Sequence, residues 1–304
     1  MPVNILQFIK NVKSNYPTIN IHALQKAMDA VTKHYYHYRD AKSAHPSVEL
    51  FLKYFYPYRE IDVDRQLSPD LEDVIEEFLE ELDTSLHQKR LRNLKRSEAR
   101  NSTSVHDYIN KLFRLYSKLL VVRVDVHYGD EIKDTMTIEE AIDDRDTYLR
   151  AVKRRYRNLL GYVWKLEYGV TRGYHYHMAF IFNGNKVQGD ISLGRQLGET
   201  WKSLSREPRT YYNCNADRNK YEEWGAYGIG MVHHDDSEKR HLLLHNALSY
   251  LLKFDEALLA EMHERFRSVG KMEVPRRRGP VIPPYSGAFK SRGQAARARC
   301  CFGV

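Results

Sequence analysis

The sequence predicts an α+β fold: an antiparallel β-sheet flanked by helices, preceded by a helical N-terminal region. Apolar residues recur at helical spacing in the first hundred residues, as in LEDVIEEFLEELDTSL. From about Leu119 the pattern changes to the period-2 alternation of strands, first in LLVVRVDVHY and again between Val163 and Phe182. The resulting order of strand, helix, strand, turn and strand is typical of an α+β domain with an antiparallel sheet.

The stretch from Val163 to Phe182, VWKLEYGVTRGYHYHMAFIF, predicts a β-hairpin with one chemical face. Alternation places His175 and His177 on one face of the second strand and bulky residues on the other. If Tyr168 pairs with Tyr174 across the turn, Glu167 lies directly opposite His175. Residues opposed in this way have Cβ atoms about 4.5 to 5.5 Å apart. The hairpin therefore predicts a metal site made of Glu167, His175 and His177.

The alternative is that these histidines are ordinary strand residues, since a chain with 14 histidines easily contains one His-x-His by chance. The apolar opposite face and the opposed glutamate favour the metal site, because ligands need a rigid platform and a third group. A mixed carboxylate and imidazole set suits Mn²⁺ or Mg²⁺, and zinc could also bind.

Three regions follow from the pattern: a helical accessory region over 1–100, the domain with the hairpin over 101–270, and a basic, weakly structured tail over 271–304. In the first region Ser68-Pro69-Asp70 predicts a helix start, and the charged stretch from Gln88 to Ser104 is a candidate linker. In the second, Thr137 and Glu140 fit a capping box that opens a helix running to Gly161. Gly194–Ser205 predicts a further helix, and Tyr211–Asn213 and Gly228–His233 predict strands.

The charge distribution points to an anionic partner. The chain carries a net charge of +8 and a pI near 9.2. Residues 271–304 hold eight basic residues against one acidic residue, a net charge of +7. The clustered Arg276, Arg277 and Arg278 favour nucleic acid over a merely solubilising end.

Composition also limits the setting in which the chain acts. No apolar run approaches the roughly 20 residues of a membrane span, so we expect no membrane association and a cytoplasmic protein. Three cysteines without CxxC spacing argue against a disulfide framework.

The segment SEKRHLLLHNALSYLLKFDEALL predicts a helix that is apolar on most sides. Tyr250 and Lys253 lie three residues apart on it, and therefore on one face. The same spacing occurs at Tyr108 and Tyr162, so only its position after the histidine strand selects Tyr250. His241 and His245 have the spacing of a helical zinc protease, but Leu242 occupies the place of the glutamate base, which favours a structural pair.

Together, the strand LLVVRVDVHY, the glutamate ahead of His-hydrophobic-His in EYGVTRGYHYH, and the later YLLK resemble the HUH endonucleases. Among these, the chain looks most like the rolling-circle replication initiators of filamentous phages and related prophage proteins. The resemblance covers roughly Leu119 to Phe254, and implies an RRM-like antiparallel sheet with a helix-borne tyrosine over the metal. One departure is Asn246, which stands where many large phage initiators carry a second tyrosine.

The resemblance implies a nickase for single-stranded DNA at a replication origin. A metal held by Glu167, His175 and His177 would polarise the scissile phosphate, and Tyr250, assisted by Lys253, would attack it and form a 5′-phosphotyrosyl intermediate. Host helicase and polymerase would be partners, and no small-molecule cofactor is expected. Alternatives are a relaxase or transposase on the same scaffold, or a non-enzymatic prophage DNA-binding regulator. Candidate DNA-binding residues are Arg123, Lys165, Arg172, Arg276, Arg277 and Arg278.

Overall fold

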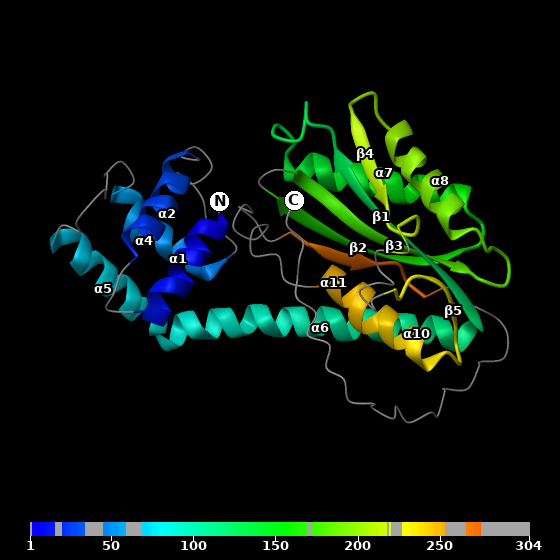
Figure 1. Cartoon of the computed structure of the whole chain (residues 1–304), viewed down its shortest axis with the longest axis horizontal. Helices are drawn as coiled ribbons and strands as arrows, with labels where there is room; N and C mark the ends of the chain where they lie inside the picture. The colour runs from blue at the N-terminus through cyan, green and yellow to red at the C-terminus, as the bar shows by residue number, and fades with distance from the viewer. Residues whose placement is uncertain are drawn as a thin grey trace.

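The computed structural model confirms the α+β class and describes residues 2–15, 20–33, 45–58, 69–169, 172–217, 219, 227–252 and 266–274. Figure 1 shows a group of N-terminal helices at one end and a sheet flanked by helices at the other, with one long helix running alongside both. The N-terminal elements are α1 (Pro2–Asn15), α2 (Ile21–Lys33), α4 (Pro46–Phe55), η1 (Tyr56–Tyr58), α5 (Pro69–Asp83) and α6 (Ser85–Leu115).

The N-terminal helices form their own core around clustered phenylalanines. Phe8, Phe51, Phe55 and Phe78 are fully buried and contact one another, with ring centroids 4.5 Å apart for Phe51 and Phe55. Each helix buries one apolar face, as the helical periodicity predicts. This region is therefore a packed unit of its own.

The long helix α6 joins this unit to the sheet. It begins after Thr84, whose side chain accepts a hydrogen bond from the backbone of His87, and it continues without a break to Leu115. The candidate linker from Gln88 to Ser104 is therefore helical, and the predicted boundary at residue 100 falls inside α6. Its C-terminal half packs against the sheet through Ile109, Leu112 and Phe113, which explains why the helix does not end at the polar stretch.

The sheet consists of β1 (Lys118–Tyr128), β2 (Leu159–Gly169), β3 (Gly173–Asn183), β4 (Arg209–Asn213), β5 (Gly230–His233) and β6 (Val269–Lys271). The strand order is β4-β1-β3-β2-β6, with β5 also paired to β1, and all these pairings are antiparallel. The predicted tail boundary at Lys271 was wrong by a few residues. Lys271 pairs with Val163, and the Met272 amide donates to the carbonyl of Tyr162.

Helices cover both faces of the sheet. One face packs under α7 (Ile138–Arg155) and α8 (Asp190–Ser203), with Tyr148 and Trp201 at the centre of that core. The other face packs on α6 and on a helical segment made of α10 (Ser237–Leu242), a π-helical turn (Leu243–Leu248) and α11 (Ser249–Leu252). His175 and His177 lie on this second face, which we call the histidine face. It is apolar where these helices pack on it and polar at one end.

The helix after Thr137 starts as predicted but ends earlier. The capping box between Thr137 and Glu140 is formed. However, α7 ends at Arg155, and Gly161 belongs to β2, where it pairs with Ile181. A Cβ atom on Gly161 would lie 1.7 Å from the hydroxyl oxygen of Tyr108. The glycine therefore allows α6 to approach the sheet closely and does not stop a helix.

Within the part of the chain that the structure describes, no helix has the length and apolar character required to cross a membrane.

The burial of His45 gives the N-terminal unit a predicted pH dependence. His45 is 4% exposed and caps α4, where its Nδ1 accepts a hydrogen bond from the Ser47 amide at 3.2 Å. Burial, reinforced by the charges of His87, Lys10 and Arg90, lowers the His45 pKa from 6.5 to about 4. Below pH 6.5 the unfolded chain therefore binds a proton that the folded unit excludes. The contribution of His45 makes the free energy of unfolding greatest above pH 6.5 and lets it decline toward pH 4.

We expect the free energy of unfolding of this unit to fall by about 3 kcal/mol over that interval. Hydrogen exchange of α4 amides as a function of pH measures it. His45→Asn keeps a capping acceptor without the titration, so its profile should be flatter over the same range. Identical pH profiles for the variant and the original chain would contradict this assignment.

Candidate metal centre

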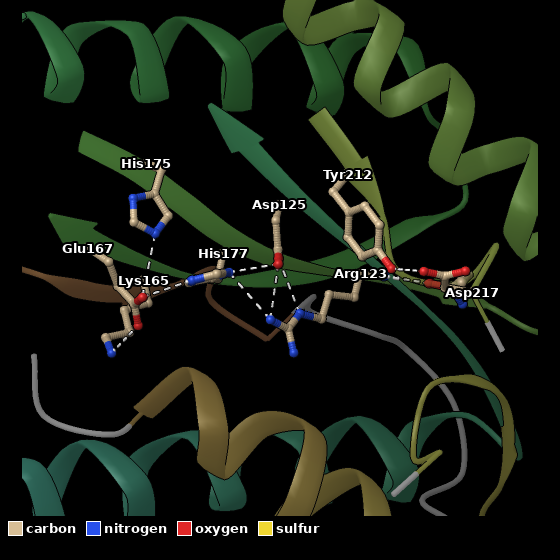
Figure 2. A network of polar contacts seen from close by, with 9 residues as sticks. Arg123, Asp125, Lys165, Glu167, His175, His177, Tyr212 and Asp217 are labelled. Carbon is tan, nitrogen blue, oxygen red and sulfur yellow. Dashed lines mark hydrogen bonds and ion pairs between the residues drawn. The ribbon is translucent and has the colours of Figure 1, made fainter. Parts of the chain in front are cut away.

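The polar end of the histidine face is built from two neighbouring rows of residues that cross the sheet. In one row Tyr212, Asp125, His177 and Lys165 lie directly opposite one another on β4, β1, β3 and β2. In the adjacent row His127, His175 and Glu167 lie on β1, β3 and β2. Because directly paired residues project to the same face, the register alone brings these side chains together, as Figure 2 shows for all of them except His127.

Glu167 is shared by both imidazoles. Tyr168 pairs with Tyr174 and Glu167 with His175, which confirms the predicted register. Glu167 Oε2 lies 2.9 Å from His177 Nε2 and 3.5 Å from His175 Nε2. One ligand atom from each of the three residues lies within 4.8 Å of the others, and no other such group of three occurs among the described residues. This arrangement has the dimensions of a metal site.

The hydrogen bonds of the two imidazoles leave their Nε2 atoms directed at the centre of this group. His175 Nδ1 donates to the carbonyl of Gly173 at 3.1 Å. His177 Nδ1 donates to Asp125 Oδ2 at 2.8 Å. Metal-binding histidines are commonly oriented in this way, with the second ring nitrogen bonded to a carbonyl or carboxylate. In both residues Nε2 is thus the atom that faces the other members of the group.

Asp125 is itself held in place by Arg123. The guanidinium donates to both carboxylate oxygens of Asp125, each at 3.1 Å, and the side chain of Arg123 is 9% exposed. The backbone amide of Arg123 donates to Asn215 Oδ1 at 2.8 Å. Arg123 Nη2 also lies 3.3 Å from His177 Nδ1. Since both nitrogens carry protons when His177 donates to Asp125, the carboxylate is the acceptor that they share.

The ionisable side chains of the group offset one another's charge. Burial alone would raise the pKa of Glu167, but the imidazoles of His175 and His177 and the Lys165 ammonium bring it well below its ordinary range. Asp125 behaves in the same way, because Arg123 and His177 outweigh burial and lower its pKa. Both groups are therefore anionic at neutral pH. Burial would lower the His177 pKa, yet the two carboxylates raise it to about 9. His177 is therefore protonated at neutral pH, and a metal ion at this site would displace the proton on its Nε2.

His127 completes the row beside His175. The two rings stack with centroids 5.2 Å apart and planes inclined by 18°. Burial, followed by the neighbouring His175, lowers the His127 pKa to about 4. His127 is thus neutral near pH 7 and lies beside the group of three without adding charge to it.

The basic residues predicted to bind DNA divide into three groups. Arg123 and Lys165 are buried, and each is paired with a carboxylate of the site, Asp125 and Glu167 respectively. Neither side chain lies on an exposed surface, and their role as DNA-binding residues stays a prediction. Arg172 is exposed at the β2–β3 turn. Arg276, Arg277 and Arg278 lie outside the described residues.

The predicted nucleophile lies on a helix over the same face of the sheet. Tyr250 belongs to α11. Its neighbours Leu251 and Leu252 are buried in the core that includes Val163 and Ala179 of the histidine face. The π-helical turn Leu243–Leu248 precedes α11, so the helix is not regular between Asn246 and Tyr250. Lys253 lies outside the described residues.

Sequence reasoning missed Asp125, His127 and the residues that support them. Asp125 and His127 alternate visibly with valines in LLVVRVDVHY, but only the β1–β3 register shows that they adjoin the histidines. Tyr212 lies opposite Asp125, and its hydroxyl donates to Asp217. Asn215, completely buried, joins Arg123 to Asp190. The alternation is thus a sequence signal for Asp125 and His127, whereas Tyr212 and Asn215 carry none.

The fold and the site together define an α+β protein with a carboxylate and imidazole cluster on a buried face of an antiparallel sheet. Residues 83–271 match the YagK/YfjJ C-terminal domain, well over half of the chain, and the chain belongs to this family. The matched segment runs from the end of α5 to the last residue of β6 and so contains the whole cluster.

One relative shows how far the similarity extends. The chain is 30% identical over 129 residues to the uncharacterized protein YagK of Escherichia coli (strain K12), an alignment that covers 33% of this chain and 62% of YagK. The chain thus spans about six tenths of the length of this curated relative. No solved structure is significantly similar to the chain described here.

The role assigned to Asp125 predicts the effect of one substitution on metal affinity. Asp125→Asn removes the negative charge that orients His177, while the amide retains the shape. Replacing such a supporting group typically lowers metal affinity 10- to 100-fold. We expect this decrease in Mn²⁺ affinity, measured by calorimetry, with an unchanged circular dichroism spectrum. Asp130→Asn, on an exposed loop residue, is the matched control, and equal affinities for the two variants would refute the role.

Proposed function

We propose that this protein is a metal-dependent endonuclease of the HUH type that nicks single-stranded DNA and initiates rolling-circle replication. The observation that carries the proposal is the cluster of Glu167, His175 and His177, whose ligand atoms lie within 4.8 Å of one another on the sheet. A helix that bears Tyr250 crosses the same face. This combination supports phosphodiester chemistry with a tyrosine nucleophile.

The donor set fits a divalent cation. Two imidazole Nε2 atoms and one carboxylate oxygen converge, and hydrogen bonds to the other ring nitrogens fix both imidazoles. Mixed oxygen and nitrogen ligands suit Mn²⁺ or Mg²⁺. When bound there, the cation would polarise the scissile phosphate and stabilise the negative charge that develops on it.

Nearby basic side chains would support the same charge. Lys165 donates directly to Glu167, whereas Arg123 donates to Asp125, which is in turn bonded to His177. In a buried setting, fixed positive groups stabilise a developing anion far better than they would in water. Their role in this proposal is to hold the carboxylates and to add positive potential at the phosphate.

The proposed reaction exchanges one phosphoester for another. The hydroxyl oxygen of Tyr250 forms a bond to phosphorus, the bond from phosphorus to the 3′ oxygen breaks, and that oxygen leaves as a 3′-hydroxyl after gaining a proton. The tyrosine loses its own proton as it attacks, and Lys253 is proposed to lower its proton affinity. Because the ester energy is kept in the phosphotyrosine, strands can be rejoined without ATP.

The proposed setting is the cytoplasm of a bacterial host. The substrate is single-stranded DNA at an origin, the free 3′-hydroxyl is a primer for a host polymerase, and a host helicase would open the duplex. A relaxase or transposase with the same site is the alternative enzyme. A prophage DNA-binding regulator with structural histidines is the alternative that lacks activity.

Metal removal tests the enzyme class. Cleavage of labelled single-stranded DNA should stop in the presence of a chelator and resume with Mn²⁺ or Mg²⁺. His175→Ala should abolish cleavage while duplex binding stays nearly the same, because phosphate contacts elsewhere supply most of the affinity. Gel electrophoresis of the cleaved strand and fluorescence anisotropy of the duplex measure the two effects. Full cleavage in chelator would show that the cluster has another role.

Replacement of single hydroxyl groups tests the nucleophile. Tyr250→Phe should leave Mn²⁺ affinity unchanged and eliminate the covalent adduct between protein and DNA, detected by mass spectrometry. Tyr212→Phe is the informative comparison, since Tyr212 is 39% exposed on the same face of the sheet and donates to Asp217. If the adduct persists in Tyr250→Phe and disappears in Tyr212→Phe, the nucleophile is Tyr212 and the assignment of Tyr250 is wrong.

A further inference from the structure

The N-terminal half of α6 carries a row of basic residues that the site does not use. Residues 85–100 contain six basic residues and one acidic residue, a net charge of +5. Four of the six, Lys89, Arg92, Arg96 and Arg100, follow one another at spacings of three, four and four residues. This spacing aligns side chains on one side of an α-helix. We call these four residues the basic stripe.

The basic stripe faces away from both parts of the protein. All four of its residues are exposed. Buried His87 precedes Arg96 by nine residues, and buried Ile109 follows Arg100 by nine residues. Nine steps of about 100° correspond to the opposite side of the helix. Figure 1 shows the N-terminal unit and the sheet on the same side of α6. The stripe therefore lies on the side of this helix that faces away from both.

Among the described residues, no acidic side chain balances the stripe. Glu98 follows Arg96 by two residues, about 200° around the helix, and is only partly exposed. By contrast, Arg90 on another side of α6 pairs with Glu49 of α4. No ion pair within the described part of the chain involves any member of the stripe. Exposed Asn93 and Thr103 flank it with neutral hydrogen-bonding groups.

We infer that the basic stripe binds the phosphate backbone of duplex DNA. The stripe extends over about 16 Å of straight helix, and three of its four residues are arginines, which bind phosphate oxygens in bidentate fashion. Uncharged hydroxyl and amide groups of the kind that flank it are also common phosphate contacts. A single row of cations suits a backbone that is recognised by charge and not by sequence.

Other anionic surfaces fit the stripe less well. A helix that lies on a membrane inserts an apolar face into the lipid. The apolar residues of α6, such as Ile109 and Leu112, are instead buried in the core against the sheet. A second copy of the chain could offer the exposed acidic side of α5, with Glu72, Glu76 and Glu80. Two chains that each carry a net charge of +8 repel one another overall, which favours DNA as the occupant.

The test is the salt dependence of duplex binding by the full chain, measured by fluorescence anisotropy with chelator present so that no metal chemistry contributes. The variant replaces Arg92, Arg96 and Arg100 with glutamine, a good helix former. Removing three phosphate contacts should reduce the slope of log affinity against log salt by about 2.7. Between about 50 and 200 mM salt, the original chain should thus lose about 40-fold more affinity than the variant.

A matched control and a charge-retaining variant make the test specific. Replacing Arg195, Lys202 and Arg206 with glutamine removes the same charge from exposed positions on or just after α8, and should leave the slope nearly unchanged. Lysine at the three stripe positions should preserve it.

Three outcomes would overturn the inference: no duplex binding by the original chain, equal slopes for the stripe and control variants, or loss of self-association in sedimentation without a change in DNA affinity. The last result would assign the stripe to contacts between copies. Because no step of this test depends on cleavage, it can fail while the proposed nicking activity stands, and the reverse also holds.

Discussion

The antiparallel register of β2 and β3 is the constraint on which the site depends. Gly169 pairs with Gly173 across the turn, and every pair from there to Gly161 and Ile181 follows in step. A shift by one residue would move Glu167 to the opposite face, because successive side chains alternate. The apolar residues of the same strands prevent this shift, since Trp164, Leu166, Tyr176 and Met178 would then leave their core. The hydrophobic core thereby fixes the positions of the polar residues.

Burial explains why so many charged groups occur together at this end of the sheet. An isolated buried charge is costly, and it is retained only where opposite charges and hydrogen bonds compensate it. Arg123 with Asp125, and Lys165 with Glu167, are such pairs, and His177 lies between the two carboxylates. The pairs hold the imidazoles at fixed angles. We propose that this rigidity prepares the site for a cation.

The hairpin could be predicted from the sequence because its information is local. Alternation defines the two faces, and a short turn fixes the register of Glu167 with His175. Asp125 could not be placed in the same way, since its contact with His177 depends on pairing between strands that are distant in the chain. The predicted helix end at Gly161 failed for a related reason: pairing of Leu159–Gly161 with β3 outweighed local helix signals. Likewise, packing against the sheet extends α6 through a stretch whose composition is typical of a linker.

Diffraction from crystals grown with Mn²⁺, recorded near the manganese absorption edge, tests the proposed metal centre most directly. We predict one strong anomalous peak within bonding distance of Glu167 Oε2, His175 Nε2 and His177 Nε2, with Asp125 still bonded to His177 Nδ1. The absence of a peak there at saturating Mn²⁺, or a peak at another group of residues only, would contradict a metal centre at this site and the cleavage mechanism that depends on it.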